Sequence, residues 1–326
     1  MYILQFFGAA PIDYSQVTNI EKNAADLVVY AIPAMAFFTF LEVWYSWYSK
    51  RKNYSTKESI GSMFVGLGNV GINLLFKAAL IYSSIFIYNL VPWRMTLNWW
   101  TIIPCLLIFD LCSYWAHRIS HYNRFFWSTH VVHHTADNYN LTVSFRLSWV
   151  QHFKMIFFLP IAFCGFHPVV FFIVNQISVL AQFWQHTEYI GKLHPWIEKI
   201  FVTPSNHRVH HGSNEQYLDK NFGAVFIFWD KIFKSYEPEG DKVIYGTTSS
   251  IEQSLNPLYL NFHEHRDMFT DIKKAKGMRK KLFFLFGSPA KIARYKADRK
   301  VEQESVKTPI IKPGLIAQPQ TASLIK

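Results

Sequence analysis

The sequence predicts an all-helical integral membrane protein, a multi-span helical bundle with a histidine-rich cap on its cytosolic side. Half of the 326 residues are hydrophobic, and residues 155–187 contain no Asp, Glu, Lys or Arg. An uncharged apolar stretch of this length is long enough to enter or cross a bilayer. The mean hydropathy of +0.06 is low for a membrane protein because Lys and Arg gather in loops and toward the C-terminus.

Three apolar stretches predict the first three spans. The first covers residues 27–47, and the basic loop behind it predicts a cytosolic end by the positive-inside rule. The second, residues 62–91, is long and interrupted, and the third covers residues 99–116. Pro92 and Arg94, with neighbouring tryptophans, form a short link typical of a membrane interface, so these two spans form a hairpin.

The second stretch carries a polar stripe. Asn69, Asn73 and Lys77 follow one another at intervals of four residues and therefore share one helix face. We expect that face to contact protein or water and not lipid.

Residues 155–185 predict a second, tighter hairpin, because the stretch is too long for one span and is broken at Gly165 and Pro168. A hairpin returns the chain to its starting side, so residues 117–134 can meet residues 207–211. After about residue 302 the composition predicts disorder.

Eight of the fourteen histidines fall into three motifs. The motifs are His-x3-His and two copies of His-x2-His-His. The latter pattern is expected only ~0.03 times by chance in such a chain, so two copies are a strong signal. The eight residues are His117 and His121, then His130, His133 and His134, then His207, His210 and His211.

Imidazole at these spacings predicts metal binding. A helix places residues i, i+3 and i+4 on one side, and a catalytic zinc needs only three protein ligands. Eight histidines therefore indicate two metals with open positions. The candidates are iron, zinc or manganese, and chemistry with dioxygen favours iron, while zinc remains an alternative in the isolated protein. Five other histidines match no ligand spacing and are expected to be ordinary surface or core residues: His152, His167, His194, His263 and His265.

Several polar residues are candidates to support such ligands. Asp110 and Tyr114 lie on the helix face of His117 and His121. Asp110 is expected either to accept a hydrogen bond from a ligand imidazole or to pair with Lys77 or another polar group inside the bundle. Three further candidates lie at the end of the second hairpin, at positions 186 and 188, and directly before the last triplet, at position 206. In this set His186 is a ninth metal-ligand candidate, and Glu188 and Asn206 are supporting candidates.

Two other classes of function are weaker explanations of the sequence. The net charge of +11 could indicate nucleic-acid binding, but the excess lies beside hydrophobic spans, where anionic lipid headgroups explain it, so we expect no nucleic acid. A histidine-rich metal transporter would place its ligands inside the spans, whereas these triplets lie outside the apolar stretches.

The motifs resemble those of the fatty acid hydroxylase and sterol desaturase superfamily. Beyond the histidines, the segments DNYNLTVSFRLS at 137–148, QFWQHTEYIGKL at 182–193 and TPSNHRVHHGSNEQYLDKNFGAVFIFWDKIF at 203–233 are most similar to its alkylglycerol monooxygenase branch. The resemblance divides the chain into an N-terminal span and basic loop (1–60), an oxygenase domain (61–265) and a basic, partly disordered tail (266–326). It implies a di-iron centre held by the eight motif histidines and by His186.

The resemblance implies a lipid substrate from the bilayer, a fatty acid, sterol or ether lipid, and dioxygen as the oxidant. We expect hydroxylation, with desaturation as the alternative, because both outcomes need the same metal centre. The chain has no nucleotide-binding glycine-rich loop, so electrons must come from a separate donor, tetrahydrobiopterin or a redox carrier. Sequences of that branch carry an acidic residue after the first motif, where this chain has Tyr122, and further C-terminal spans. The resemblance to the branch alone therefore does not assign the pterin or the ether lipid, and both stay among the alternatives.

Overall fold

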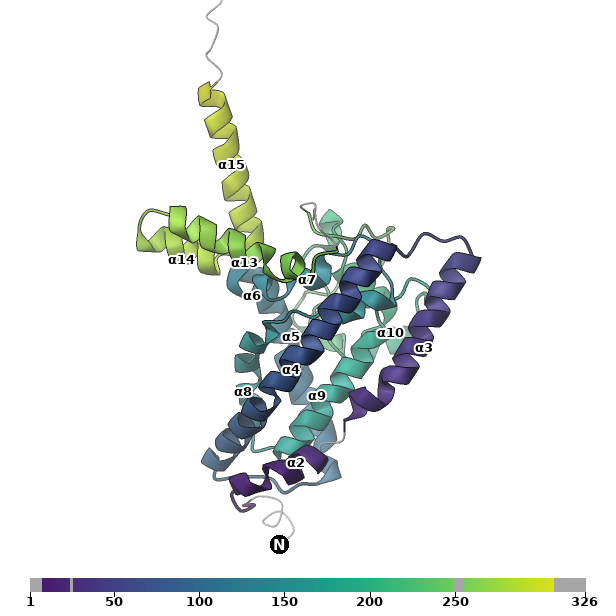
Figure 1. Ribbon diagram of the computed structural model, residues 1–326, viewed down its shortest axis with the longest axis vertical. Helices are drawn as coiled ribbons and strands as arrows, with labels where there is room; N and C mark the ends of the chain where they lie inside the picture. Colours follow the sequence, from purple (N-terminus) through teal and green to yellow (C-terminus); the bar gives the residue numbers. More distant parts are fainter. Residues whose placement is uncertain (1–7, 24–25, 249–254, 308–326) are drawn as a thin grey trace, which may run out of the picture.

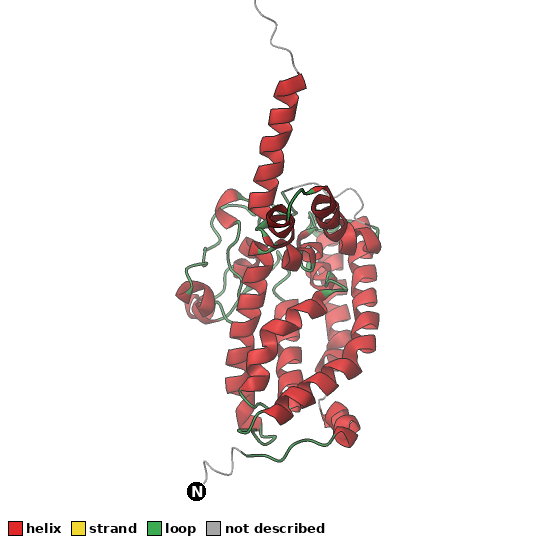
Figure 2. Cartoon of the chain, turned by 90° about the vertical axis from the view of Figure 1, so that its left-hand side faces the viewer, coloured by secondary structure: helices red, strands yellow, loops and turns green. Residues whose placement is uncertain are grey.

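The computed structural model describes residues 8–23, 26–248 and 255–307, and these ranges are helical apart from loops and one isolated bridge between Phe201 and Phe226 (Figures 1 and 2). Long helices run side by side along the bundle, and short helices form a cap at one end. The predicted all-helical class is confirmed.

Within the described ranges, three helices are long and apolar enough to cross a membrane. They are α3 (Leu27–Tyr48), α4 (Thr56–Leu90) and the unit formed by η2 (Trp99–Thr101) and α5 (Ile102–Tyr122). The chain is thus a membrane protein, as predicted. The long, interrupted apolar stretch of the second span forms one continuous helix, α4.

Two glycines inside α4 allow close packing against this helix. A Cβ at Gly68 would lie 2.3 Å from the indole of Trp149, and one at Gly66 would lie 3.1 Å from the Phe145 side chain. The glycines therefore let the segment that follows the first triplet lie directly against α4.

The predicted second hairpin contains only one long helix. Its first arm is irregular, built from η4 (Gln151–Phe158) and α8 (Leu159–Phe163), and its second arm is α9 (Pro168–Phe183). Gly165 makes the turn with φ of +82°, and a Cβ there would lie 2.5 Å from the carbonyl oxygen of Trp93. Both arms pack on α5 through a buried cluster that includes Phe109, Ile161 and Val174.

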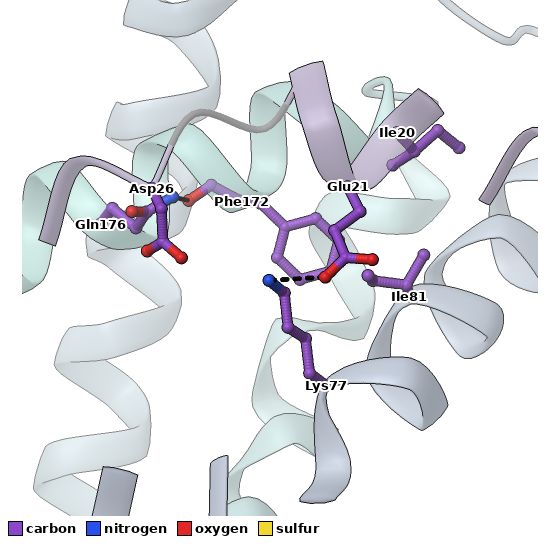
Figure 3. A pocket seen from close by; sticks show the side chains of 7 residues that line it. All are labelled: Ile20, Glu21, Asp26, Lys77, Ile81, Phe172 and Gln176. Carbon is purple, nitrogen blue, oxygen red and sulfur yellow. Dashed lines mark hydrogen bonds and ion pairs between the residues drawn. The ribbon is translucent and has the colours of Figure 1, made fainter. Parts of the chain in front are cut away.

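The polar stripe of α4 contacts protein, as predicted. The Asn69 amide donates to the carbonyl of Ser148, and Asn73 donates to Asn69. Lys77 pairs with Glu21 of α2 (Val17–Asn23) at 2.8 Å, in a pocket between α2, α4 and α9 (Figure 3). This pocket lies at the end of the bundle opposite α7 (Val131–His134) (Figure 1).

The cap consists of short helices joined by long loops. Pro, Asn and Thr begin several of them, because their side chains or fixed φ suit a helix N-terminus. Besides α7 they are α6 (Arg124–Ser128), η3 (Leu141–Phe145), α10 (Pro195–Ile200), α11 (Pro204–His210), η5 (Glu215–Tyr217) and α12 (Phe228–Ile232).

The C-terminal region forms α13 (Pro257–Lys274), α14 (Met278–Phe286) and α15 (Pro289–Lys307). The expected disorder after residue 302 was wrong up to residue 307, and the rest of that expectation lies outside the described residues. The domain boundary expected at residue 265 falls inside α13. The Arg124 guanidinium of α6 binds Glu264 and Asp271 of α13 at 2.6 and 2.7 Å, which ties this helix to the cap.

Candidate metal centre

Nine histidine side chains meet in the cap in two groups. Within each group, one ring nitrogen of every residue lies within 4.8 Å of the others. The first group is His117, His121, His130, His134 and His210, and the second is His133, His186, His207 and His211. The structure therefore brings together all nine residues that the sequence singled out, including His186.

Each triplet is divided between the two groups. In α7 and its preceding residue, His130 and His134 belong to the first group and His133 to the second. In α11 and the residue after it, the assignment is reversed: His207 and His211 belong to the second group and His210 to the first. Residues at i and i+4 lie one above the other on a helix, and the residue at i+3 lies beside them at a different angle around the helix axis. In each triplet the outer pair therefore joins one group and the middle histidine joins the other.

The Nε2 atoms form short contacts inside the second group. Those of His133 and His211 are 3.1 Å apart, those of His207 and His186 are 3.1 Å apart, and those of His186 and His133 are 3.2 Å apart. Such a set converges on a common point, as ligands of one cation do.

The Nδ1 atoms are held by carbonyl oxygens, which fixes the tautomer of three rings. His117 donates to Phe222 at 2.9 Å, His210 to Lys220 at 2.9 Å, and His186 to Gln182 at 2.8 Å. A carbonyl can only accept, so Nδ1 carries the proton and Nε2 of the neutral ring carries a lone pair. The Nε2 atoms of His117 and His121 are buried without a hydrogen-bond partner among the described residues, as expected of atoms that bind a metal.

Burial keeps these imidazoles neutral. It lowers the pKa of His186 to about 4 and holds the pKa of His207, His210 and His211 well below the ordinary value. Neutral imidazole is the form that binds a metal. The residues present therefore fit two metal ions.

One short loop supports three rings of the first group. Besides the carbonyls of Lys220 and Phe222, it provides the Asp219 carboxylate, 3.3 Å from Nδ1 of His121. Asp219 and Asn221 have φ of +58° and +54°, a left-handed conformation that Asp and Asn adopt more readily than most side chains. The two left-handed residues bend the loop so that consecutive acceptors face the histidines.

Asp110 of α5 binds the backbone just after the loop of residues 219–222 and binds no imidazole. Its carboxylate accepts from the backbone amides of Val225 at 2.7 Å and Phe226 at 3.1 Å. A ligand imidazole and Lys77 are thus not its partners, because the ligand rings find backbone acceptors and Lys77 pairs with Glu21. The remaining alternative, another polar group inside the protein, describes the two amides. Asp230 acts in the same way on Phe222 and Gly223.

The other supporting candidates also act through the cap and not through a ring. The Tyr114 hydroxyl bonds to Ser235 and accepts from Arg118. Asn206 donates to the Glu198 carboxylate, and Glu188 accepts from Tyr245.

Sequence reasoning missed two kinds of supporting residue. Asp219 lies within the loop that follows the last triplet, and the pattern Asp-x-Asn could have indicated a left-handed turn there. Glu42 comes from α3, far from any motif, and its carboxylate accepts from Thr187, next to His186, and from the amide of Leu141. No spacing signal could have found it.

The five remaining histidines lie outside both groups, as expected. His152 stacks on Phe76, and His167 accepts a hydrogen bond at the N-terminus of α9. These two contacts are ordinary structural roles.

Residues 102–235 match the family model of fatty acid hydroxylases. The chain is 33% identical over 277 residues to alkylglycerol monooxygenase of Xenopus tropicalis, covering 82% of this chain and 61% of the relative. The human protein of that name is 35% identical over 291 residues, covering 87% and 64%. A C-4 methylsterol oxidase of Schizosaccharomyces pombe is 24% identical over 143 residues, covering 42% and 47%. The chain thus spans less than two thirds of the length of each of these relatives. No solved structure matches it.

Proposed function

Because residues 102–235 form a domain of the fatty acid hydroxylase family, we propose that the chain is a membrane-bound lipid oxygenase, an oxidoreductase that hydroxylates a C–H bond of a lipid with dioxygen. The observation that carries the proposal is the pair of histidine groups at the end of a bundle of apolar helices. That position allows a lipid to reach the site from the bilayer.

The nine histidines would hold two iron ions, one in each group. When bound, the metal supplies the activation of dioxygen and the oxidation of an unactivated C–H bond. The donor set supports iron over softer metals, because the cap offers imidazole nitrogens, and the three cysteines lie elsewhere, in α5 and directly after α8.

The chain's own residues position the site and exclude water. The carbonyls of Lys220, Phe222 and Gln182 keep three rings in the tautomer that directs Nε2 inward. Burial of the second group, with every member below 9% exposure, keeps bulk water away from the oxidised carbon.

The substrate is a fatty acid, a sterol or an ether lipid. Curated relatives are named alkylglycerol monooxygenase, C-4 methylsterol oxidase and ornithine lipid hydroxylase, so an alkylglycerol ether is the first lipid to test, followed by a fatty acid and a sterol. Electrons come from a separate donor, tetrahydrobiopterin or a small redox carrier. The reaction converts one C–H bond, dioxygen, two electrons and two protons into an alcohol and water.

The test uses the full chain reconstituted with ferrous iron, one lipid, one donor and oxygen-18 dioxygen. Hydroxylation places one labelled oxygen atom in the product, and His133→Ala abolishes it while His265→Ala does not. A new double bond without label would replace hydroxylation by desaturation. No altered lipid with any donor, together with metal crossing the membrane, would replace the enzyme by a transporter.

A further inference from the structure

Helices α13 and α14 pack against each other and lie crosswise to the long helices, level with the ends of α3 and α4 that face the cap (Figure 1). They project to one side of the bundle, whereas α15 points away from it. A helix pair in this orientation lies parallel to the bilayer plane that the spans define.

Each of the two helices exposes an apolar stripe. Met278, Leu282 and Phe286 of α14 follow one another at intervals of four and are 68%, 47% and 49% exposed. Leu258 and Phe269 of α13 are 59% and 56% exposed, and their separation of eleven residues returns to nearly the same face. These side chains are not the core face of the helices, because Leu260, Met268 and Phe284 are buried instead.

The segment that joins the stripes is strongly basic. Residues 273–281 contain six Lys or Arg residues and no acidic residue, and five of the six are exposed: Lys273, Lys274, Lys276, Arg279 and Lys281. Apolar residues flanked by basic ones are typical of a helix that lies in a membrane interface.

The three acidic residues of α13 do not offset this charge, because the carboxylate of Asp267 pairs with Arg266 of the same helix at 3.1 Å and the other two turn inward. Glu264 and Asp271 turn inward to Arg124, and Asp271 also binds Lys296 of α15. The amide of Arg124 donates to the carbonyl of Gly287. These bonds fix the hairpin to α6, so its exposed surface keeps one orientation relative to the spans.

We propose that this surface, defined as the exposed stripes of α13 and α14 with the basic segment 273–281, docks on the anionic headgroup layer of the bilayer that the chain spans. Two observations select a bilayer over a protein partner: α13 and α14 lie level with the cap-side ends of the candidate spans α3 and α4 (Figure 1), and the charge of the surface complements anionic lipid. The docked hairpin holds α6, and with it the segment that leads into the first triplet, at a fixed height above the membrane.

The test is spin labelling of the full chain in bilayers. The variants Leu282→Cys and Val301→Cys place the label on the proposed surface and on α15, where Val301 is 67% exposed. Relaxation by oxygen, which concentrates in lipid, is compared with relaxation by a water-soluble nickel chelate. Labelled wild-type protein corrects for the native cysteines.

In bilayers containing phosphatidylglycerol, the label at 282 should relax mainly with oxygen and the label at 301 mainly with nickel. The triple variant Lys276→Gln, Arg279→Gln, Lys281→Gln should weaken docking about 100-fold, at about fivefold for each charge, and raise the nickel effect at 282. Equal nickel access at 282 and 301 overturns the proposal. A label at 282 that neither reagent reaches also overturns it, because another protein surface would then cover the stripe.

Discussion

The Nε2 atoms of His134 and His210 lie 3.2 Å apart, although 76 residues separate them in the sequence. His133 and His211 make a similar contact at 3.1 Å. Both contacts join a residue that follows α5 with a residue that follows α9. The hairpin between these positions therefore brings the two triplets together, and each complete histidine group contains residues from both sides of the hairpin.

The first prediction concerns metal content. Wild-type protein purified without oxygen should contain about two metal ions per chain, because two separate groups offer imidazole donors. His133→Ala and His210→Ala should each reduce the content toward about one and abolish activity, since they affect different groups. Elemental analysis measures this, and His265→Ala is the control. Full metal content in both variants would contradict the two-group assignment.

The second prediction concerns Asp219, whose carboxylate faces Nδ1 of His121. Asp219→Ala removes the partner that orients this ring, so the affinity of the first group for metal should fall roughly 10–100-fold. Asp219→Asn keeps an acceptor and should lose less. Metal release to a chelator measures the effect, and Asp241→Ala, on an exposed residue, is the matched control. Release from Asp219→Ala at the wild-type rate would show that His121 needs no partner.

The third prediction concerns Asp110 inside the third span. Asp110→Ala leaves the amides of Val225 and Phe226 without their acceptor, at a cost of roughly 1–3 kcal/mol for each buried amide. The thermal midpoint should fall, and metal loss should follow because the loop at Phe222 moves. Asp267→Ala, on an exposed carboxylate of α13, should change neither. A stable Asp110→Ala protein would exclude this supporting role.

The fourth prediction concerns Glu239, which binds the Arg208 guanidinium through both carboxylate oxygens at 2.7 Å. Burial acts to raise the pKa of Glu239, but the hydrogen bonds and charge of Arg208 outweigh it and leave that pKa below the ordinary 4.5. The folded state thus binds the proton less readily than the unfolded state. The contribution of the pair is fully present above pH 4.5 and is lost as the pH falls through the lowered value.

Glu239→Gln should therefore destabilise the protein at pH 7 by roughly 1.5–3 kcal/mol, the range for hydrogen bonds to charged groups. The difference between variant and wild type should shrink as the pH falls below 4.5. Thermal midpoints measured from pH 3.5 to pH 8 test this. A difference that is constant across the range would mean that the carboxylate charge contributes nothing.

Local signals were sufficient for most of the site. The triplets carry their own spacing, and the hairpin at Gly165 and Pro168 explained why they could meet, so all nine histidines were found from the sequence. Asp110 was identified as important because a carboxylate inside a span is costly. Its partner was not predictable, because it depends on where residues 222–226 pass in three dimensions.

The fold was less predictable at its ends and around glycine. A glycine in a helical pattern does not indicate which residue packs against it, and Gly66 and Gly68 make room for Phe145 and Trp149. The polar composition after residue 266 indicated a tail. The inward ion pairs of Glu264 and Asp271 with Arg124 stabilise α13 instead, and such long-range pairs leave no local pattern.

The last prediction concerns orientation. The basic loop after α3, with Lys50, Arg51, Lys52 and Lys57, predicts that the cap faces the cytosol. Glu215→Cys on the cap and Thr96→Cys between α4 and α5 are both at exposed positions on opposite ends of α5. In sealed vesicles with the cytosolic face inside, an impermeant maleimide should label only the cysteine at 96, and in inverted vesicles only the cysteine at 215.

Wild-type protein should remain nearly unlabelled, because Cys105 and Cys112 are buried and Cys164 is only partly exposed. Labelling of both positions from the same side would contradict the spanning arrangement, and the opposite pattern would place the cap outside the cytosol.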